Sequence, residues 1–214
     1  MIVTSSPEQV LITLREPASA AAEAYRTLRT NILFSSLDKP IHTLLLTSAE
    51  QTPDKSLTAA NLAVTMAQAE QRVLLVDCDL RQPTLHTIFG LSNEQGLTSA
   101  ILDQEAPLAI QPTEVPGLSL LPSGPLPPRP ADLLGSRRME GLLNRLRQIA
   151  DIVIFDTPPV QPFTDALVLA TRVDGVLLVI QAGRSRRDRV REARQKLEKV
   201  KANLLGVVLS GARI

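Results

Sequence analysis

Three short apolar segments in this sequence are each followed by side chains that can bind phosphate or a metal ion. Lys55 and Ser56 come after "HTLLLT" and a polar turn, while Asp77 and Asp156 end "RVLLVD" and "DIVIFD". A lysine can contact the β- and γ-phosphates of a nucleotide, a neighbouring hydroxyl can bind Mg²⁺, and an acid at a strand end can anchor that ion. The residue types therefore indicate a site for a Mg-nucleotide, with Ser56, Asp77 and Asp156 as candidate metal-binding residues.

A second acid, Asp79, lies two positions after Asp77. The two acids alternate with Cys78 at the strand end, and their carboxylates are expected to be close without sharing a direction. One could hold a metal-bound water while the other activates an acceptor hydroxyl. Each of these signals also has a purely structural explanation, since a Lys-Ser pair arises by chance and an acid after a buried strand is often only the first solvated residue. The order of the three segments along the chain is what favours the core of a P-loop ATPase.

Alternating apolar and amphipathic segments predict the elements that position these side chains. Continuous apolar runs, typical of parallel strands covered on both faces, occur at 42–47, 72–77, 151–156, 175–182 and 203–210, with a weaker strand at 118–123. Helices are expected at 20–36, 55–69, 136–150, 163–171 and 186–201. This alternation predicts an α/β fold, a doubly wound and mostly parallel sheet of the P-loop NTPase type in a three-layer α/β/α arrangement. The proline-rich segment 124–134 is expected to be an ordered surface loop that packs through Leu126, Leu133 and Leu134.

The composition limits the size of the protein and its partners. Of the 214 residues, 44% are hydrophobic and 21% are charged, so a single domain over residues 1–214 is expected. A formal net charge of +1 gives no global attraction to nucleic acid. With one cysteine, Cys78, and two histidines, His42 and His86, no structural metal is expected. The sequence shows neither a membrane-spanning run nor a signal-peptide pattern, and we expect a cytoplasmic location.

Several segments together resemble the cytoplasmic kinase domain of bacterial tyrosine kinases. They are "EAYRTLRTNILFSS", "TSAEQTPDKSLTAANLA", "LLVDCDLRQPTLHTIFG", "GLTSAILD", "LPSGPLPPRPADLLGS", "IVIFDTPPVQPFTDALVLA" and "VDGVLLVIQAGRSRRDRVREARQKLEKV". The resemblance implies a protein that binds Mg-ATP or Mg-ADP and accompanies capsule and exopolysaccharide synthesis. It further implies homo-oligomeric rings and a membrane-anchored polysaccharide co-polymerase as activator, which would place the protein at the inner face of the plasma membrane.

The resemblance also implies roles for individual positions. Lys55 and Ser56 match the end of the Walker A loop, Asp77 and Asp79 the second aspartate motif, Arg81 the last residue of "DxDxR", and Asp156 the Walker B acid. Lys55, Asp77, Asp79 and Arg81 are accordingly the candidate catalytic residues.

A ring-contact helix is implied at 20–36, after an N-terminal extension of residues 1–19. Glu23, Arg26 and Arg29 match the family's E-x-x-R-x-x-R motif, with the arginines one helical turn apart on one face. A helix with this pattern could equally make only internal salt bridges.

The phosphate loop departs from the family pattern. The family's loop ends approximately Pro-Gly-x-Gly-Lys-Ser-Thr, and here Gln51 is followed by the candidate cofactor-binding residues Thr52, Pro53, Asp54, Lys55, Ser56 and Leu57. Both glycines, which let backbone approach phosphate, are missing, and Pro53 has no N–H to donate. A carboxylate of Asp54 about 4 to 5 Å from the β-phosphate would repel it by roughly 3 to 4 kcal/mol at an effective dielectric near 20. Weakened or lost ATP binding is therefore expected.

Considered without the family, "TPDKS" is a strong helix start. Thr52 suits the N-cap, Pro53 suits position N1, and Asp54 falls in the first turn near the positive end of the helix dipole. Their side chains would satisfy groups that otherwise hold phosphate. The sequence thus predicts that side chains of the loop itself occupy the site where a phosphate would otherwise bind.

Three functions remain compatible with these residues. A kinase-like scaffold with impaired nucleotide binding and an active Mg-ATP-dependent protein-tyrosine kinase with an atypical loop are both open. A positioning or partitioning ATPase is disfavoured, because the place of its signature lysine is occupied by Glu50. The family's kinases commonly phosphorylate a C-terminal tyrosine cluster, whereas the one tyrosine here is Tyr25, so phosphorylation of such a tail is not expected.

Overall fold

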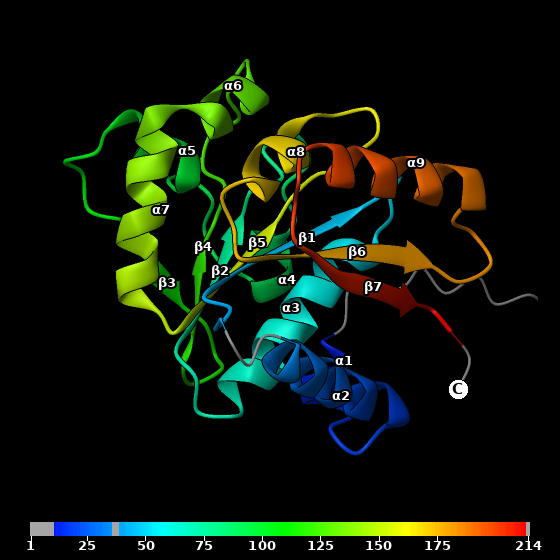
Figure 1. Cartoon of the computed structure of the whole chain (residues 1–214). Helices are drawn as coiled ribbons and strands as arrows, with labels where there is room; N and C mark the ends of the chain where they lie inside the picture. The colour runs from blue at the N-terminus through cyan, green and yellow to red at the C-terminus, as the bar shows by residue number, and fades with distance from the viewer. Residues whose placement is uncertain (1–10, 36–38, 213–214) are drawn as a thin grey trace, which may run out of the picture.

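A single sheet of seven strands forms the centre of the molecule (Figure 1). The computed structural model describes residues 11–35 and 39–212. The strands are β1 (Thr43–Ser48), β2 (Val73–Asp77), β3 (Gln111–Pro112), β4 (Leu118–Leu121), β5 (Ile152–Asp156), β6 (Gly175–Gln181) and β7 (Leu204–Ser210). Their order is β3-β4-β2-β5-β1-β6-β7, and every neighbouring pair is parallel except β3 with β4. The predicted doubly wound, mostly parallel α/β fold is confirmed.

Helices cover both faces of this sheet. They are α1 (Ile12–Arg15), α2 (Ala20–Phe34), α3 (Asp54–Ala67), α4 (Leu85–Phe89), α5 (Leu97–Leu102), α6 (Pro130–Gly135), α7 (Arg137–Ile149), α8 (Asp165–Ala170) and α9 (Arg187–Lys199). One buried cluster joins α3 and α4 to one face of the sheet, and a second joins α5, α7, α8 and α9 to the other. Figure 1 shows the two helical layers on opposite sides of the strands, as the three-layer prediction requires.

The continuous apolar strands are buried where the sheet is covered on both faces. β1, β2 and β5 are buried along their whole length. The same expectation was wrong for β7, which is an edge strand with Val207 and Leu209 about half exposed, at 50% and 54%. A strand at the edge has a neighbour on one side only, so its apolar residues are not all enclosed.

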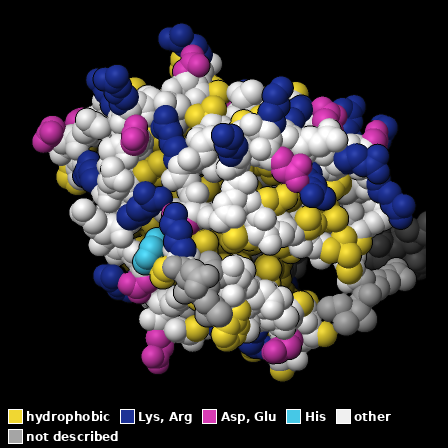
Figure 2. Space-filling model, viewed as in Figure 1, with side chains coloured by type: hydrophobic (Ala, Val, Ile, Leu, Met, Phe, Trp, Pro, Cys, Tyr) yellow, Lys and Arg dark blue, Asp and Glu magenta, His cyan; other side chains and the backbone are white. Residues whose placement is uncertain are grey.

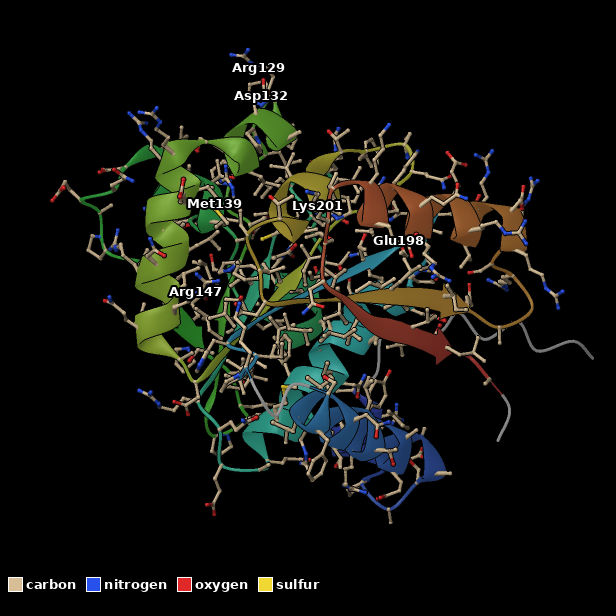
Figure 3. All side chains as sticks on the ribbon, viewed as in Figure 1. Arg129, Asp132, Met139, Arg147, Glu198 and Lys201 are labelled. Carbon is tan, nitrogen blue, oxygen red and sulfur yellow. The ribbon has the colours of Figure 1, made fainter. Side chains whose placement is uncertain are left out.

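The proline-rich segment is partly helical, which corrects the expected loop. Pro130 begins α6, a position where its missing N–H costs nothing, and Leu134 is fully buried. Leu126, expected to pack, is 59% exposed. Arg129 at the N-cap and Asp132 in the first turn of α6 form an exposed ion pair of 3.6 Å at the tip of the segment (Figure 3).

The second half of the expected N-terminal extension packs on the domain. Thr13 in α1 is buried, and both its backbone N–H and its hydroxyl donate to Asn61 Oδ1 in α3, at 3.0 and 2.8 Å. Residues 1–10 lie outside the described residues, as does Ser36 at the end of the expected ring-contact helix. Among the helices of the described ranges, none combines the length and the apolar character that crossing a membrane requires.

Candidate active site

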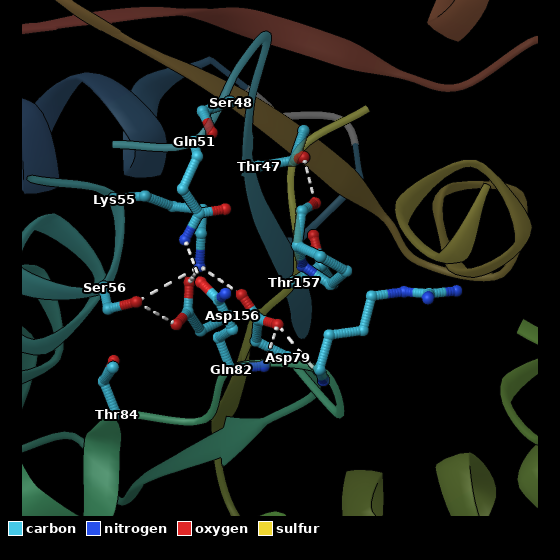
Figure 4. A network of polar contacts seen from close by, with 12 residues as sticks. Thr47, Ser48, Gln51, Lys55, Ser56, Asp79, Gln82, Thr84, Asp156 and Thr157 are labelled. Atoms are coloured by element: carbon cyan, nitrogen blue, oxygen red, sulfur yellow. Dashed lines mark hydrogen bonds and ion pairs between the residues drawn. The ribbon is translucent and has the colours of Figure 1, made fainter. Parts of the chain in front are cut away.

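Lys55, Ser56 and Asp156 meet at the carboxyl end of the central strands (Figure 4). The loop after β1 leads into α3, whose first turn carries Lys55 and Ser56, and β5 beside it ends in Asp156. Lys55 Nζ lies 2.6 Å from Asp156 Oδ1, and the Ser56 hydroxyl donates to Asp156 Oδ2 at 2.6 Å. The Lys55 side chain is 1% exposed and that of Asp156 is fully buried. The fold therefore brings Asp156 together with the Lys55–Ser56 pair, which lies 101 and 100 positions before it in the sequence.

Asp79 reaches the same group from the end of β2. Its Oδ2 lies 3.6 Å from Lys55 Nζ, while its Oδ1 accepts the backbone N–H of Gln82 at 3.0 Å and that of Arg81 at 3.4 Å. Burial raises the pKa of Asp79, against the opposing pull of the Lys55 charge. A carboxylate with a raised pKa holds a proton more readily than a solvated one, which suits a proton acceptor.

Asp77 faces a different direction, toward the start of α4. Its Oδ2 accepts the N–H groups of Thr84 and Leu85 at 3.1 and 3.0 Å, and its Oδ1 accepts that of Asp79 at 3.2 Å. Its carboxylate thus provides the N-terminal cap of α4. Burial, and next the charge of Asp156, raise the pKa of Asp77 to about 8.

The site carries more negative than positive charge. Burial lowers the pKa of Lys55, but the carboxylates, led by Asp156 and Asp79, outweigh burial and raise it above the ordinary value. One ammonium group therefore faces three buried carboxylates. Hard divalent cations prefer oxygen ligands of this kind, so the donor set fits Mg²⁺.

A buried hydroxyl at the same end of the sheet adds to this fit. The Thr84 hydroxyl oxygen is buried with no hydrogen-bond partner, and Figure 4 shows Thr84 near this group. Within the described residues no cluster of three or more His, Cys, Asp or Glu side chains is arranged around one point. That is compatible with Mg²⁺, which usually binds one or two protein carboxylates and completes its shell with waters and phosphate oxygens.

The phosphate loop has the sequence-predicted cap in part. The N–H of Asp54 points to the Thr52 hydroxyl at a long 3.4 Å, and Pro53, with helical φ and ψ of −66° and −22°, precedes the helix that begins at Asp54. The Asp54 carboxylate accepts the Ser210 hydroxyl at 2.8 Å, which ties it to the end of β7. Leu57, half-buried in the first turn, accepts a hydrogen bond from Asn61 at 2.9 Å. The loop is thus held by its own side chains and by β7.

Arg81 is fixed by two residues that the sequence did not single out. Its guanidinium donates to the carboxylate of Asp165 at 3.1 to 3.3 Å and lies over the ring of Phe163, 4.0 Å from the ring centroid. Asp165 is fully buried. The acid in "FTDALVLA" was a possible signal for this pairing, but only the fold shows that it lies beside Arg81.

A cavity of about 330 Å³ opens beside Asp79. Its lining includes Gln51 of the phosphate loop, Arg81, Gln161 and Phe163. A second hollow, of about 310 Å³, lies between α2 and the end of β7 and is lined by Tyr25, Thr58 and Ser210 among others. Burial, opposed by a hydrogen bond with Thr58, raises the pKa of Tyr25.

The residues of the predicted ring-contact motif differ in their surroundings. Arg26 pairs with Glu23 at 2.7 Å within α2 and also donates to the carbonyl of Pro17. Arg29 turns inward and donates to the carbonyl of Thr65 in α3 at 2.7 Å. Glu23 is the most exposed of the pair, at 66%. All three side chains therefore make contacts within the chain. Glu23 is exposed, Arg26 and Arg29 are both half-buried, and Arg29 alone of the three contacts α3.

Comparison with known proteins identifies the family. Residues 53–205 match a family model described as an AAA domain. The chain is 42% identical over 211 residues to the tyrosine-protein kinase YwqD of Bacillus subtilis (strain 168), with 98% of this chain and 89% of YwqD covered. This chain belongs to the family of bacterial tyrosine-protein kinases.

Solved structures of this family share the fold. The structure of the chimerical protein CapA2B2 matches with a TM-score of 0.89 and 39% identity, covering 93% of this chain and 88% of that one. The kinase domain of the Escherichia coli tyrosine kinase ETK matches with a TM-score of 0.87 and 32% identity, covering 100% of this chain and 87% of that one. The predicted family and the P-loop type of fold are confirmed, while the impaired phosphate loop stays a prediction.

Proposed function

We propose that the protein is a kinase-like member of its family that acts in capsule or exopolysaccharide synthesis, or in its regulation, and binds Mg-ATP and Mg-ADP weakly. The observation that carries this proposal is that the site keeps its lysine, serine and aspartate together while the loop before them lacks glycines. The residues that would contact nucleotide, Lys55 and Ser56, are in place against Asp156. The loop before them carries Thr52, Pro53 and Asp54 instead of glycines, and Asp54 is tied to Ser210 of β7.

In this proposal each buried group has a defined task. Lys55 contacts the β- and γ-phosphates, and Ser56 with Asp156 holds Mg²⁺, which supplies charge neutralisation of the phosphates when bound. Asp79 accepts the proton of an acceptor hydroxyl that enters the adjoining cavity, because its raised pKa and its place at the cavity wall suit a base. Asp77 orients the loop before α4 and remains a candidate for metal-bound water.

Weak binding follows from two costs of opening the site. Lys55 must exchange its 2.6 Å contact with Asp156 for phosphate oxygens. A loop with Thr52, Pro53 and Asp54 in place of a glycine-rich turn also offers fewer backbone donors close to the phosphates. Both costs reduce affinity without disturbing the fold.

The partners and the location of this proposed function come from the family. We expect a membrane-anchored polysaccharide co-polymerase as activator, a homo-oligomeric ring, no nucleic acid, and a cytoplasmic position at the inner face of the plasma membrane. The surface that Figure 2 presents mixes Lys and Arg with Asp and Glu, which suits protein contacts better than a continuous polyanion.

An active protein-tyrosine kinase is the second candidate, because Lys55, Ser56, Asp79 and Asp156 are all present. Calorimetric titration with Mg-ATP and Mg-ADP, followed by a phosphotyrosine assay on a tyrosine-containing polymer, separates the two. We expect dissociation constants in the high-micromolar range or weaker, and little phosphotyrosine. Tight binding and phosphotyrosine that disappears in the Asp79→Asn variant would establish the active kinase instead.

A further inference from the structure

Arg189, in the first turn of α9, lies beside the phosphate loop. Its Nε is 3.9 Å from Glu50 Oε1, and its Nη1 donates to Gln161 Oε1 at 3.1 Å. Gln161 in turn donates to the Arg189 carbonyl at 3.0 Å. Gln161 also lines the cavity next to Asp79, as does Gln51, so the guanidinium group is bonded to a residue of that cavity wall.

The guanidinium of Arg189 has hydrogen-bonding capacity to spare. Its Nε is buried and has no hydrogen-bond acceptor, since the 3.9 Å contact with Glu50 is too long for one. The side chains of Arg189 and Glu50 are both 43% exposed, and ion pairs of that kind are weak. Glu192, 3.3 Å from Nη1, is shared with Lys196 at 3.0 Å. A new anionic partner could therefore replace Glu50 at small cost.

The other cations of the site are already engaged. Lys55 faces three buried carboxylates, and Arg81 is paired with the fully buried Asp165. A terminal phosphate brings additional negative charge to a site that is already acidic. An arginine fork, always charged and able to donate two parallel hydrogen bonds, is the side chain best suited to balance it.

We propose that Arg189 binds the terminal phosphate of a nucleoside triphosphate that occupies the site of its own chain. In the absence of that phosphate, Glu50 pairs with Arg189. The proposal rests on the proposed function, because it concerns the nucleotide of the same site. It predicts that the protein binds a nucleoside triphosphate more tightly than a diphosphate. Arg189 contributes to this preference, and Glu50 opposes it because it competes with the phosphate for Arg189.

Two nucleotides and four variants test this role. The dissociation constants of Mg-ADP and of a Mg-bound, non-hydrolysable ATP analogue are measured by calorimetry for the native protein and for Arg189→Gln, Arg189→Lys, Glu50→Gln and Arg194→Gln. Arg194 is the matched control, since it lies on the same helix and pairs at 2.7 Å with Glu198, which Figure 3 labels. Thermal unfolding of each variant checks the fold.

We expect Arg189→Gln to weaken the triphosphate analogue about tenfold, the scale of one lost charge-assisted hydrogen bond, and to leave Mg-ADP within about twofold. The affinity of Arg189→Lys for the triphosphate analogue should lie between those of the native protein and Arg189→Gln. Glu50→Gln should bind the triphosphate analogue more tightly than the native protein does. Arg194→Gln should change the affinity for neither nucleotide. Equal losses for both nucleotides, or an unchanged preference, would overturn the role of Arg189 alone. A native protein that binds neither nucleotide would overturn the proposed function and this role with it.

Discussion

Among single residues, Asp77 shows how burial separates the roles of two neighbouring acids. Asp79 faces Lys55, whereas Asp77 accepts the N–H groups at the start of α4 and has its pKa raised to about 8 by burial and the charge of Asp156. The folded protein thus keeps a proton on Asp77 that the unfolded chain releases near the ordinary value of 3.8.

This difference predicts a pH-dependent stability. A carboxyl group whose folded pKa is raised contributes stability that is present below its unfolded pKa and is lost as the pH rises through its folded pKa. The stability of the native protein relative to Asp77→Asn should therefore fall between about pH 5 and pH 8, by at most about 1.4 kcal/mol per pH unit, and level off above. Urea unfolding at a series of pH values measures it. Asp188→Asn, at an exposed acid, should show no such slope over this range, and a constant difference between native and Asp77→Asn would contradict the assignment.

Lys55 is predicted to be structural as well as a ligand for phosphate. Lys55→Met would leave the carboxylates of Asp156 and Asp79 buried without a cation, which should lower the free energy of unfolding by about 3 to 5 kcal/mol. The exposed Lys199→Met should stay within about 0.5 kcal/mol of native. Chemical denaturation gives both values. A loss below about 1 kcal/mol for Lys55→Met would mean that water reaches the cluster.

Among the elements, those set by local pattern were predictable and those set by distant partners were not. The run at 72–77 predicted β2 because a continuous apolar stretch suits a strand enclosed on both faces. The short helix α4 was missed, because its cap is Asp77 from another element, and the pairing of Arg81 with Asp165 spans 84 positions. The edge position of β7 was likewise invisible, since it depends on the order of strands in the sheet.

The contact between α2 and α3 supplies a prediction at this scale. Arg29→Met removes the 2.7 Å hydrogen bond to the Thr65 carbonyl and should lower the free energy of unfolding by about 1.5 to 3 kcal/mol. Arg26→Met breaks an exposed pair and should cost about 0 to 1 kcal/mol. Thermal or urea unfolding compares them. Equal losses would show that Arg29 is no more important to the fold than its exposed neighbour.

At the scale of the whole molecule, the sheet order gathers the site and leaves α2 at the surface. Placing β1 between β5 and β6 brings the phosphate loop next to Asp156 and Gln181, as the doubly wound pattern predicted. Which face meets another copy was predicted from the family motif alone. In the structure Arg29 contacts α3, while Glu23 and Arg26 pair within α2, and a ring contact through these three residues stays a prediction.

Assembly through this surface can be tested with a charge exchange. The double change Glu23→Lys with Arg26→Glu preserves an ion pair within α2 and inverts the pattern shown to a partner. If rings form through this surface, light scattering at low salt should show their loss in the variant and their weakening with salt in the native protein. An assembly that survives the exchange uses another surface.

The central claim is that the phosphate loop, with Thr52, Pro53 and Asp54 in place of a glycine-rich turn, weakens nucleotide binding. Calorimetric titration of Mg-ATP into the native protein and into the variant Thr52→Gly, Pro53→Glu, Asp54→Gly tests it most directly. We predict a native dissociation constant in the high-micromolar range or weaker, and binding at least tenfold tighter in the variant, or about 1.4 kcal/mol. The variant should also melt at a lower temperature, since the 2.8 Å hydrogen bond between Asp54 and Ser210, worth about 1 kcal/mol, is removed and two glycines are added. Tight binding by the native protein, or an unchanged affinity in the variant, would show that this loop is a working phosphate site of another kind.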